Sequence, residues 1–381
     1  MGVMKLQDYF DTDANKVYLE IGPLYNPMLK KGEYNVRYLD FRTTEEVKAT
    51  YEGSYADVSG IVDIDYATGS RSYKETVGNQ KFDGVYSRHC IEHTYDVIGH
   101  LLDVASILKE VGRYVIEIPD GSCWFDYFRQ PTTFREAYCV YKGASLNCFI
   151  SESGLDTIPL FSGSDIEKFK RKDVSFIGEL IGEEYRIKKS KEIMEGEDIF
   201  YPEDSPHIWV FTTRSFLELY RDCLRFNIFP YKMIFYSGPD SEGRDCTIKV
   251  VLEKCSRILE DDDYRLSEII RTQLRIEEIG GETGGRIASA FKNHKEVYLY
   301  GKGKVSKILY DAFKEFFDKN VGFVVSDDVE QDGDDVLKLS QLKPSENVFI
   351  IIATKTKEYV EQMEENLVIN GFIRGEHYIT I

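Results

Sequence analysis

Positive charge is scarce in this chain of 381 residues, which has 48 lysines and arginines against 66 aspartates and glutamates and a formal net charge of −18. Such a chain repels phosphate backbones and anionic membrane surfaces, which argues against a nucleic-acid-binding protein. Long hydrophobic runs are also missing. The longest strand-like apolar run, Val348 to Ala353, falls far short of the roughly 18 residues that cross a bilayer. We expect no membrane span and, since the first residues lack the apolar stretch of a signal peptide, a cytoplasmic protein.

Paired cysteines are absent as well. The seven cysteines are dispersed, and none forms a C-x-x-C pair. An odd, scattered set suits a reducing compartment and argues against a disulfide framework or a structural zinc site on thiolates. The composition, 42% apolar and 30% charged, is otherwise ordinary for a folded globular protein. The length indicates two or three domains.

What the sequence does contain is an alternation of short apolar strands with helical segments over its first 120 residues. Apolar residues between 97 and 108 recur at helical spacing. Strands that alternate with helices predict an α/β fold with a parallel sheet, whose ligands bind at the carboxyl ends of the strands. Five strands are expected, at residues 17–21, 36–39, 60–64, 82–86 and 114–118.

The rest of the chain divides into three regions. Residues from about 123 to 205 break the alternation, and we interpret them either as an insertion over the ligand edge of the sheet or as a surface subdomain with its own core. A helix over 213–224 and a strand over 247–252 then complete the first pattern. The expected domains are 1–256, a helical linker at 257–294, and a second, smaller α/β domain at 295–381. In this last domain we expect strands at 297–300, 321–325 and 348–352 and a helix that ends at 317.

The residues best placed for chemistry follow the expected strand ends. Glu20 and Gly22 stand at the first end, Asp40 at the second and Asp65 at the third. An acidic residue about 20 positions after a glycine turn can accept both hydroxyl protons of a ribose, and Asp65 could accept from an adenine amino group. Gly22 would let the backbone approach such a ligand closely.

These residues belong to a series of motifs that resembles the S-adenosylmethionine-dependent methyltransferases with a Rossmann-like fold. The resemblance covers residues 17 to about 254 and fades between 140 and 200. The motifs are L-E-I-G-x-x-x-N-P at 19–27, R-Y-x-D at 37–40, a T-x-E-E-L-like helix start at 43–47, F-D-x-V-x-x-x-H-x-x-E-H at 82–93, P-D-x-x-x-x-F-D-x-x-R-x-x-T at 119–132, and a segment beginning H-x-W at 207–219.

The resemblance implies that S-adenosylmethionine is the cofactor. It also implies methyl transfer to a small acceptor, and since this branch often accompanies glycosyltransferases, to oxygen of a sugar, a nucleotide-sugar or a glycan-linked molecule. The residues it places at the cofactor are Glu20, Gly22, Pro23, Tyr25, Asn26, Asp40, Asp65, Ser87, Arg88 and His89.

Methyl transfer needs an acceptor atom held in line, at about 3–3.5 Å, more than it needs a metal. A base helps if that atom is a hydroxyl oxygen, and the catalytic candidates are His89, Asp120 and His207. The candidates for binding the acceptor are Trp124, Asp126 and Arg129. Arg129 could bind an anionic group in fork geometry, or it could equally pair with Asp126.

The segment from His89 to His93 also fits H-x-x-E-H, the inverted zincin signature, in which two histidines one helical turn apart bind zinc. That signature belongs within a helix, whereas this segment directly follows an expected strand. We therefore expect no metal. Capping of the following helix by Glu92 and His93 is the preferred interpretation.

Two other functions stay open. The first motif has one glycine where the wider family has three, which allows a catalytically degenerate binding or scaffold protein. In the C-terminal domain, Gly301, Gly303 and Asp327 form half a dinucleotide fingerprint, which allows a nucleotide-sugar oxidoreductase or a sensor. For that domain we prefer a docking module through which the chain could form a homo-oligomer.

Overall fold

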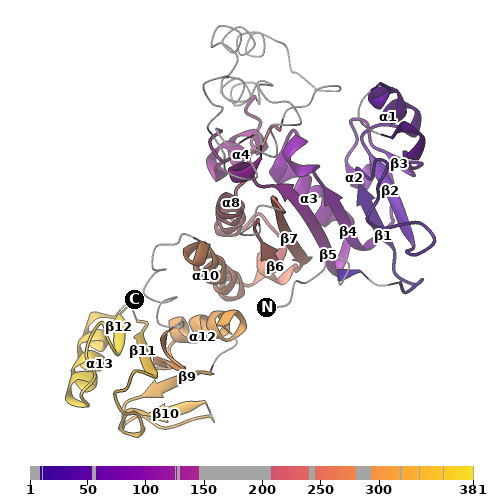
Figure 1. Ribbon diagram of the computed structural model, residues 1–381. Coiled ribbons are helices and arrows are strands. Elements are labelled where there is room, and N and C mark those ends of the chain that lie inside the picture. The colour runs from indigo at the N-terminus through magenta and orange to yellow at the C-terminus, as the bar shows by residue number, and fades with distance from the viewer. Residues whose placement is uncertain are drawn as a thin grey trace, which may run out of the picture. The chain divides into compact units, whose positions relative to one another are not determined.

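The computed structural model forms two compact units (Figure 1). The first comprises Met1–Leu219 and Phe229–Ser256, and the second comprises Tyr220–Ile228 and Arg257–Ile381. Among the residues that the structure describes, no helix combines the length and the apolar character of a membrane span. The described residues are 9–10, 12–53, 57–124, 126, 129–145, 207–239, 245–279, 293–317, 320–333, 335–354 and 356–380.

A seven-stranded sheet with the strand order β3-β2-β1-β4-β5-β7-β6 organises the first unit. Strand β7 runs antiparallel to both of its neighbours, and all other neighbouring strands pair in parallel. The predicted α/β fold is therefore confirmed. The strands are β1 Tyr18–Ile21, β2 Val36–Asp40, β3 Tyr66–Ala67, β4 Phe82–Arg88, β5 Leu108–Pro119, β6 Tyr231–Ser237 and β7 Thr247–Lys254.

The strand expected at 60–64 is wrong. A 3₁₀ turn, η2 (Val58–Gly60), is capped there by the Asp57 side chain. The next amides bond to a loop and to a helix start rather than to a strand, since Val62 N donates to Leu24 O at 3.0 Å and Ile64 N donates to Thr44 Oγ1, in the first residue of α1, at 2.9 Å. Strand β3 begins only after this segment. Apolar alternation does not distinguish a strand from a loop whose amides find other partners.

Local signals explain where the helices of the first unit begin. Thr43 and Ser72 each form a capping box, and the Asp96 carboxylate accepts from Gly99 N at the start of the third helix. That helix buries Ile98 and Leu101 completely. The helices are α1 Thr44–Tyr51, α2 Tyr73–Val77, α3 Val97–Ile107, α4 Phe134–Tyr141 and α8 Thr213–Arg225, whose residues from Tyr220 onward belong to the second unit.

The sheet order places a switch point between β1 and β4. After β1 the chain adds β2 and then β3 on one side of β1. It then crosses over and adds β4 on the other side of β1. Open α/β sheets bind their ligands beyond the carboxyl ends of the strands at such a point. Here those ends are followed by Gly22 and by His89.

The second unit contains a parallel five-stranded sheet with the order β10-β9-β8-β11-β12. Its strands confirm those expected near 297, 321 and 348, whereas β10, β12 and α13 were not predicted. Its core includes Leu299, Phe313 and Ile351. The elements are α9 Arg257–Glu260, α10 Asp262–Ile279, β8 Glu296–Tyr300, α12 Lys304–Phe317, β9 Asn320–Val325, β10 Val336–Lys338, β11 Val348–Ile352, α13 Lys357–Ile369 and β12 Tyr378–Thr380.

Candidate functional site

The turns after β1 and β4 touch at the switch point. Gly22 has a φ of +65°, and a Cβ atom on it would lie 2.6 Å from Cys90 Sγ. The Cys90 thiol in turn lies 3.4 Å from Ile21 O. Only glycine fits this position, because both the backbone conformation and the close thiol exclude a side chain.

Glu20 shapes the loop that follows Gly22. Its two carboxylate oxygens accept from Met28 N and Leu29 N, each at 2.8 Å, and its side chain is buried. Burial raises the pKa of Glu20 to about 7, although the two backbone hydrogen bonds act in the opposite direction. The carboxylate therefore fastens the segment to β1, and its contact with a cofactor stays a prediction.

The first part of this loop carries three other residues predicted at the cofactor. Pro23 is buried, Tyr25 and Asn26 are exposed, and Leu24 between them has a φ of +48°. The Leu24 carbonyl accepts from Val62 N, so the loop lies against the segment that precedes β3. This arrangement brings the loop and the Asp65 region together at one edge of the sheet.

The two aspartates at the neighbouring strand ends differ. Asp65 accepts from Tyr38 N at 2.7 Å and pairs with Lys31 Nζ at 2.8 Å, so its carboxylate is committed to the protein. Asp40 lies at the end of β2, where Oδ1 accepts from Arg42 N at 3.1 Å. Burial raises the pKa of Asp40, even though this bond and the nearby Arg42 guanidinium lower it.

Ser87 does not present its side chain to the crevice. It is fully buried, and its Oγ lies 2.7 Å from Tyr114 OH. The Tyr114 hydroxyl also lies 2.8 Å from His100 Nε2, and His100 Nδ1 lies 3.0 Å from Tyr73 OH. The Ser87 side chain therefore belongs to a buried polar network, and only its backbone is left for the predicted cofactor contact.

His89 is strained and has an unused nitrogen. Its φ is +50°, an uncommon value for a residue with a side chain, and its backbone N donates to Glu117 O at 3.0 Å. Its buried Nε2 has no hydrogen-bond partner among the described residues, and its ring lies edge-on to Trp124. Burial first, and then the charges of Arg88 and His207, lower the pKa of His89 to about 4. Neighbouring Arg88 is exposed, with Nε 3.8 Å from Glu117 Oε2.

Asp120 caps a helix. Its Oδ2 accepts from Thr213 N and Thr213 Oγ1, each at 3.0 Å, and its Oδ1 accepts from Ser122 N at 2.9 Å. Oδ2 thus holds the first residue of α8, and Oδ1 caps the 3₁₀ turn η4 (Gly121–Cys123). We do not retain Asp120 as a general base.

Arg129 pairs with Asp126 instead of presenting an open fork. The Nη1–Oδ1 distance is 2.9 Å, and both side chains are buried. The guanidinium also donates to His207 O at 2.5 Å and Ile208 O at 3.1 Å. The alternative of an internal ion pair is confirmed, and it stands against the predicted role of both residues in binding the acceptor.

His207 is held by the same carboxylate. Its Nδ1 lies 2.5 Å from Asp126 Oδ2. Burial alone would raise the pKa of Asp126, but the contacts with His207 and Arg129 lower it. Asp126 therefore stays ionised and orients the His207 ring.

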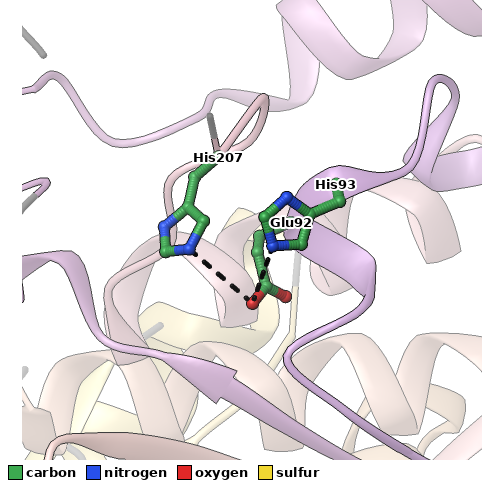
Figure 2. A group of neighbouring side chains, drawn as sticks. All are labelled: Glu92, His93 and His207. Carbon is green, nitrogen blue, oxygen red and sulfur yellow. Dashed lines mark ion pairs between the residues drawn. The ribbon is translucent and has the colours of Figure 1, made fainter. Parts of the chain in front are cut away.

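Glu92 was assigned the wrong role by sequence. Its side chain is only 1% exposed, neither carboxylate oxygen has a hydrogen-bond partner within the described part of the chain, and α3 is capped by Asp96 instead. Oε1 lies 3.9 Å from His93 Nε2 and 4.0 Å from His207 Nε2 (Figure 2). Burial raises the pKa of Glu92 to about 8, and the nearby Asp126 charge adds to this. Both histidines stood in quoted motifs, but nothing local in the sequence showed that they meet.

The fingerprint residues of the second unit are also committed elsewhere. Asp327 Oδ1 accepts from Ser340 Oγ at 2.7 Å and from Ser340 N at 3.2 Å. Gly301 has a φ of +84° and turns the chain after β8. Asp327 therefore closes a local turn, which stands against a ribose-binding role. Residues 146–206, most of the predicted insertion, lie outside the described residues.

Comparison with known proteins adds likenesses of fold. No family model and no curated protein matches the sequence. A SAM-dependent methyltransferase from Aquifex aeolicus is 7% identical with a TM-score of 0.31, over 65% of this chain and 87% of that one. A SAM-dependent methyltransferase from Methanosarcina mazei is 10% identical with a TM-score of 0.30, over 66% and 96%. The N-methyltransferase NodS from Bradyrhizobium japonicum is 8% identical with a TM-score of 0.27, over 63% and 86%.

Proposed function

We propose that the first unit is an S-adenosylmethionine-dependent methyltransferase whose cofactor binds at the switch point between β1 and β4. The observation that carries the proposal is the convergence of three features at one sheet edge. These are the Gly22 turn in contact with Cys90, the half-buried carboxylate of Asp40 on the adjacent strand, and the Nε2 of His89, which has no hydrogen-bond partner in the described part of the chain. The motif series read from the sequence supports it independently.

The residues present fit an adenosine-containing cofactor. Asp40 ends the strand next to β1, where a carboxylate can accept from both ribose hydroxyls, and Gly22 allows close approach of the backbone. Asp65 is less suited to an adenine amino group, because Lys31 and Tyr38 N already occupy its oxygens. Asp40 is thus the principal cofactor-binding carboxylate.

Bound S-adenosylmethionine supplies an electrophilic methyl group, so the chain has to position an acceptor and take up its proton. An acceptor oxygen forms a bond to the methyl carbon as the carbon–sulfur bond breaks, and the hydroxyl proton passes to a base. Among the predicted bases, His89 fits best, because its Nε2 has no hydrogen-bond partner among the described residues, whereas both oxygens of Asp120 are already bonded. Trp124 beside it offers the acceptor an apolar surface.

The acceptor class we propose is the hydroxyl group of a sugar, nucleotide-sugar or glycan-linked molecule in the cytoplasm. This rests on the resemblance of the motif series. The second unit would then serve docking or self-association, since Asp327 is not open to a dinucleotide ribose. A binding protein without turnover is the competing function, and it predicts cofactor affinity with no methylation of any such acceptor.

Calorimetric titration of the full chain with S-adenosylhomocysteine tests the proposal. We expect one binding site, at least tenfold weaker in Asp40→Asn. Asp13→Asn is the matched control, because Asp13 precedes β1 and so belongs to the opposite edge of the sheet. Absence of binding by the wild type would refute the proposal, and equal affinities in all three proteins would refute the role of Asp40.

A second experiment separates catalysis from binding. His89→Asn should lower the rate at which a nucleotide-sugar pool is methylated by about 10²–10⁴, as expected for loss of a general base. The affinity of this variant for S-adenosylhomocysteine should change little. An unchanged rate would remove His89 from the mechanism.

A further inference from the structure

Glu92, His93 and His207 bring three metal-ligating atoms together in the first unit. One carboxylate oxygen and two imidazole nitrogens all lie within 4.8 Å of one another. Figure 2 shows both rings directed at the same carboxylate. A tetrahedral ion with bonds of about 2.0–2.1 Å needs donor atoms about 3.4 Å apart, so closure of each donor pair by at most about 1.4 Å would complete the set.

Within the described part of the chain, the Glu92 carboxylate has only long ion-pair contacts, to His93 Nε2 at 3.9 Å and to His207 Nε2 at 4.0 Å. Its two oxygens are buried and accept no hydrogen bond from the described residues. A buried carboxylate normally is paired, is hydrogen-bonded or coordinates a metal. An ion between Glu92 and the two histidines would satisfy this group.

The His207 ring is already oriented as a ligand. Its Nδ1 is bonded to Asp126, which pairs with Arg129, and this leaves Nε2 to face Glu92. Carboxylate–histidine pairs of this kind fix the tautomer and raise the basicity of metal-binding histidines. Asp126 is therefore a positioning residue for this donor.

Backbone hydrogen bonds hold the two donor segments together. The Glu92 carbonyl accepts from Ile208 N at 2.7 Å and from Trp209 N at 3.0 Å. The Trp209 indole donates to Thr94 O at 2.7 Å. The donor residues thus lie on two segments that are hydrogen-bonded to each other. One is the 3₁₀ turn η3 (Ile91–His93) after β4, and the other is the stretch before α8.

We propose that Glu92, His93 and His207 bind one divalent transition-metal ion, with Zn²⁺ as the best-fitting ion. Two imidazoles and one carboxylate without sulfur are a zinc donor set that leaves a fourth position open, and the same set also accepts Fe²⁺. The His93 side chain is 33% exposed, so the open position can be reached by water or by an oxygen of a bound molecule. The site departs from the expectation of no metal, and it uses His207 in place of His89.

Metal titration of the full chain tests this site. The protein is stripped with a chelator, and Zn²⁺ is then titrated in competition with a chromophoric chelator. We expect one equivalent to bind, at least 100-fold more weakly in Glu92→Gln and in His93→Ala, and about 10–100-fold more weakly in Asp126→Asn. His93→Ala puts the fold at little risk, because that side chain is partly exposed. Melting temperatures measured in chelator identify any variant that fails to fold.

His89→Ala is the matched control, because it removes the other histidine of the H-x-x-E-H segment and should leave Zn²⁺ affinity unchanged. Co²⁺ should give visible bands without the near-ultraviolet bands of thiolate ligation. The proposal is overturned if wild type and Glu92→Gln bind Zn²⁺ equally, if thiolate bands appear, or if His89→Ala abolishes binding. Binding of S-adenosylhomocysteine is measured on the same variants, so failure of the metal site and failure of the methyltransferase proposal are distinguished.

Discussion

At Gly22 a side chain is excluded twice, once by a φ of +65° and once by Cys90 Sγ, 2.6 Å from the place of a Cβ atom. Gly69 has a similar φ of +53° but open space around it. A side chain at Gly69 would meet only backbone strain, whereas a side chain at Gly22 would meet the same strain and a clash with Cys90 Sγ. Comparing the two positions therefore isolates the effect of the clash. Only the first position lies at the switch point of the sheet.

Gly22→Ala should destabilise the first unit by about 2 kcal/mol or more, whereas Gly69→Ala should cost about 1 kcal/mol. Urea unfolding followed by tryptophan fluorescence measures this, because both tryptophans, Trp124 and Trp209, belong to the first unit. Equal losses in the two variants would show that Cys90 does not restrict the turn.

Glu20 should make stability depend on pH. Burial raises its folded-state pKa to about 7 from the ordinary 4.5. Between these values the folded chain still holds a proton that the unfolded chain has released. The stabilisation is therefore complete below about pH 4.5 and is lost as the pH rises through 7. The unfolding free energy of the wild type should fall across this window, and less steeply in Glu20→Gln.

Glu46 provides the opposite control. Hydrogen bonds from the Thr43 backbone and side chain lower its pKa in the folded state. Its stabilisation is present above the unfolded pKa of about 4.5 and is lost only as the pH falls below that value, so Glu46→Gln should leave the decline from pH 4.5 to 7 nearly unchanged. An equally flattened decline in both variants would contradict the assignment to Glu20.

At the scale of elements, Asp120 couples the end of β5 to the start of α8. Replacement by alanine removes three hydrogen bonds to buried or partly buried groups and should cost about 2 kcal/mol. Thr43→Ala, which removes an exposed cap of α1, should cost about 1 kcal/mol or less. Urea unfolding measures both. If the Asp120→Asn variant keeps the stability and the S-adenosylhomocysteine affinity of the wild type but loses methyl transfer, Asp120 is a catalytic residue after all.

At the scale of the molecule, two units with separate cores should unfold separately. Calorimetry should show two unfolding transitions. Only the transition of the first unit, which tryptophan fluorescence also reports, should shift to higher temperature when S-adenosylhomocysteine is added. At 100 times the dissociation constant, the expected stabilisation of the first unit is about 2.7 kcal/mol. A shift of the other transition would instead assign the nucleotide site to the second unit.

The sequence by itself determined the α/β class, most strands of both sheets and, to within one residue, the ends of β1 and β2. Apolar periodicity and turn residues are local properties, so they can be read without the fold. The strand expected at 60–64 was wrong because its amides bond to the distant Leu24 and Thr44. Local pattern carries no record of such partners.

Only the tertiary structure decided which polar groups are committed and which are available. The sequence offered Asp120 as a catalytic residue and Asp65 beside Asp40 as a cofactor ligand, yet Thr213 and Lys31 occupy the first two. Glu92 looked like a cap, yet the fold buries it between its neighbour His93 and the distant His207. The physical reason is that a carboxylate's role follows from the donors brought within about 3 Å of it, and chain folding, not local spacing, brings them there.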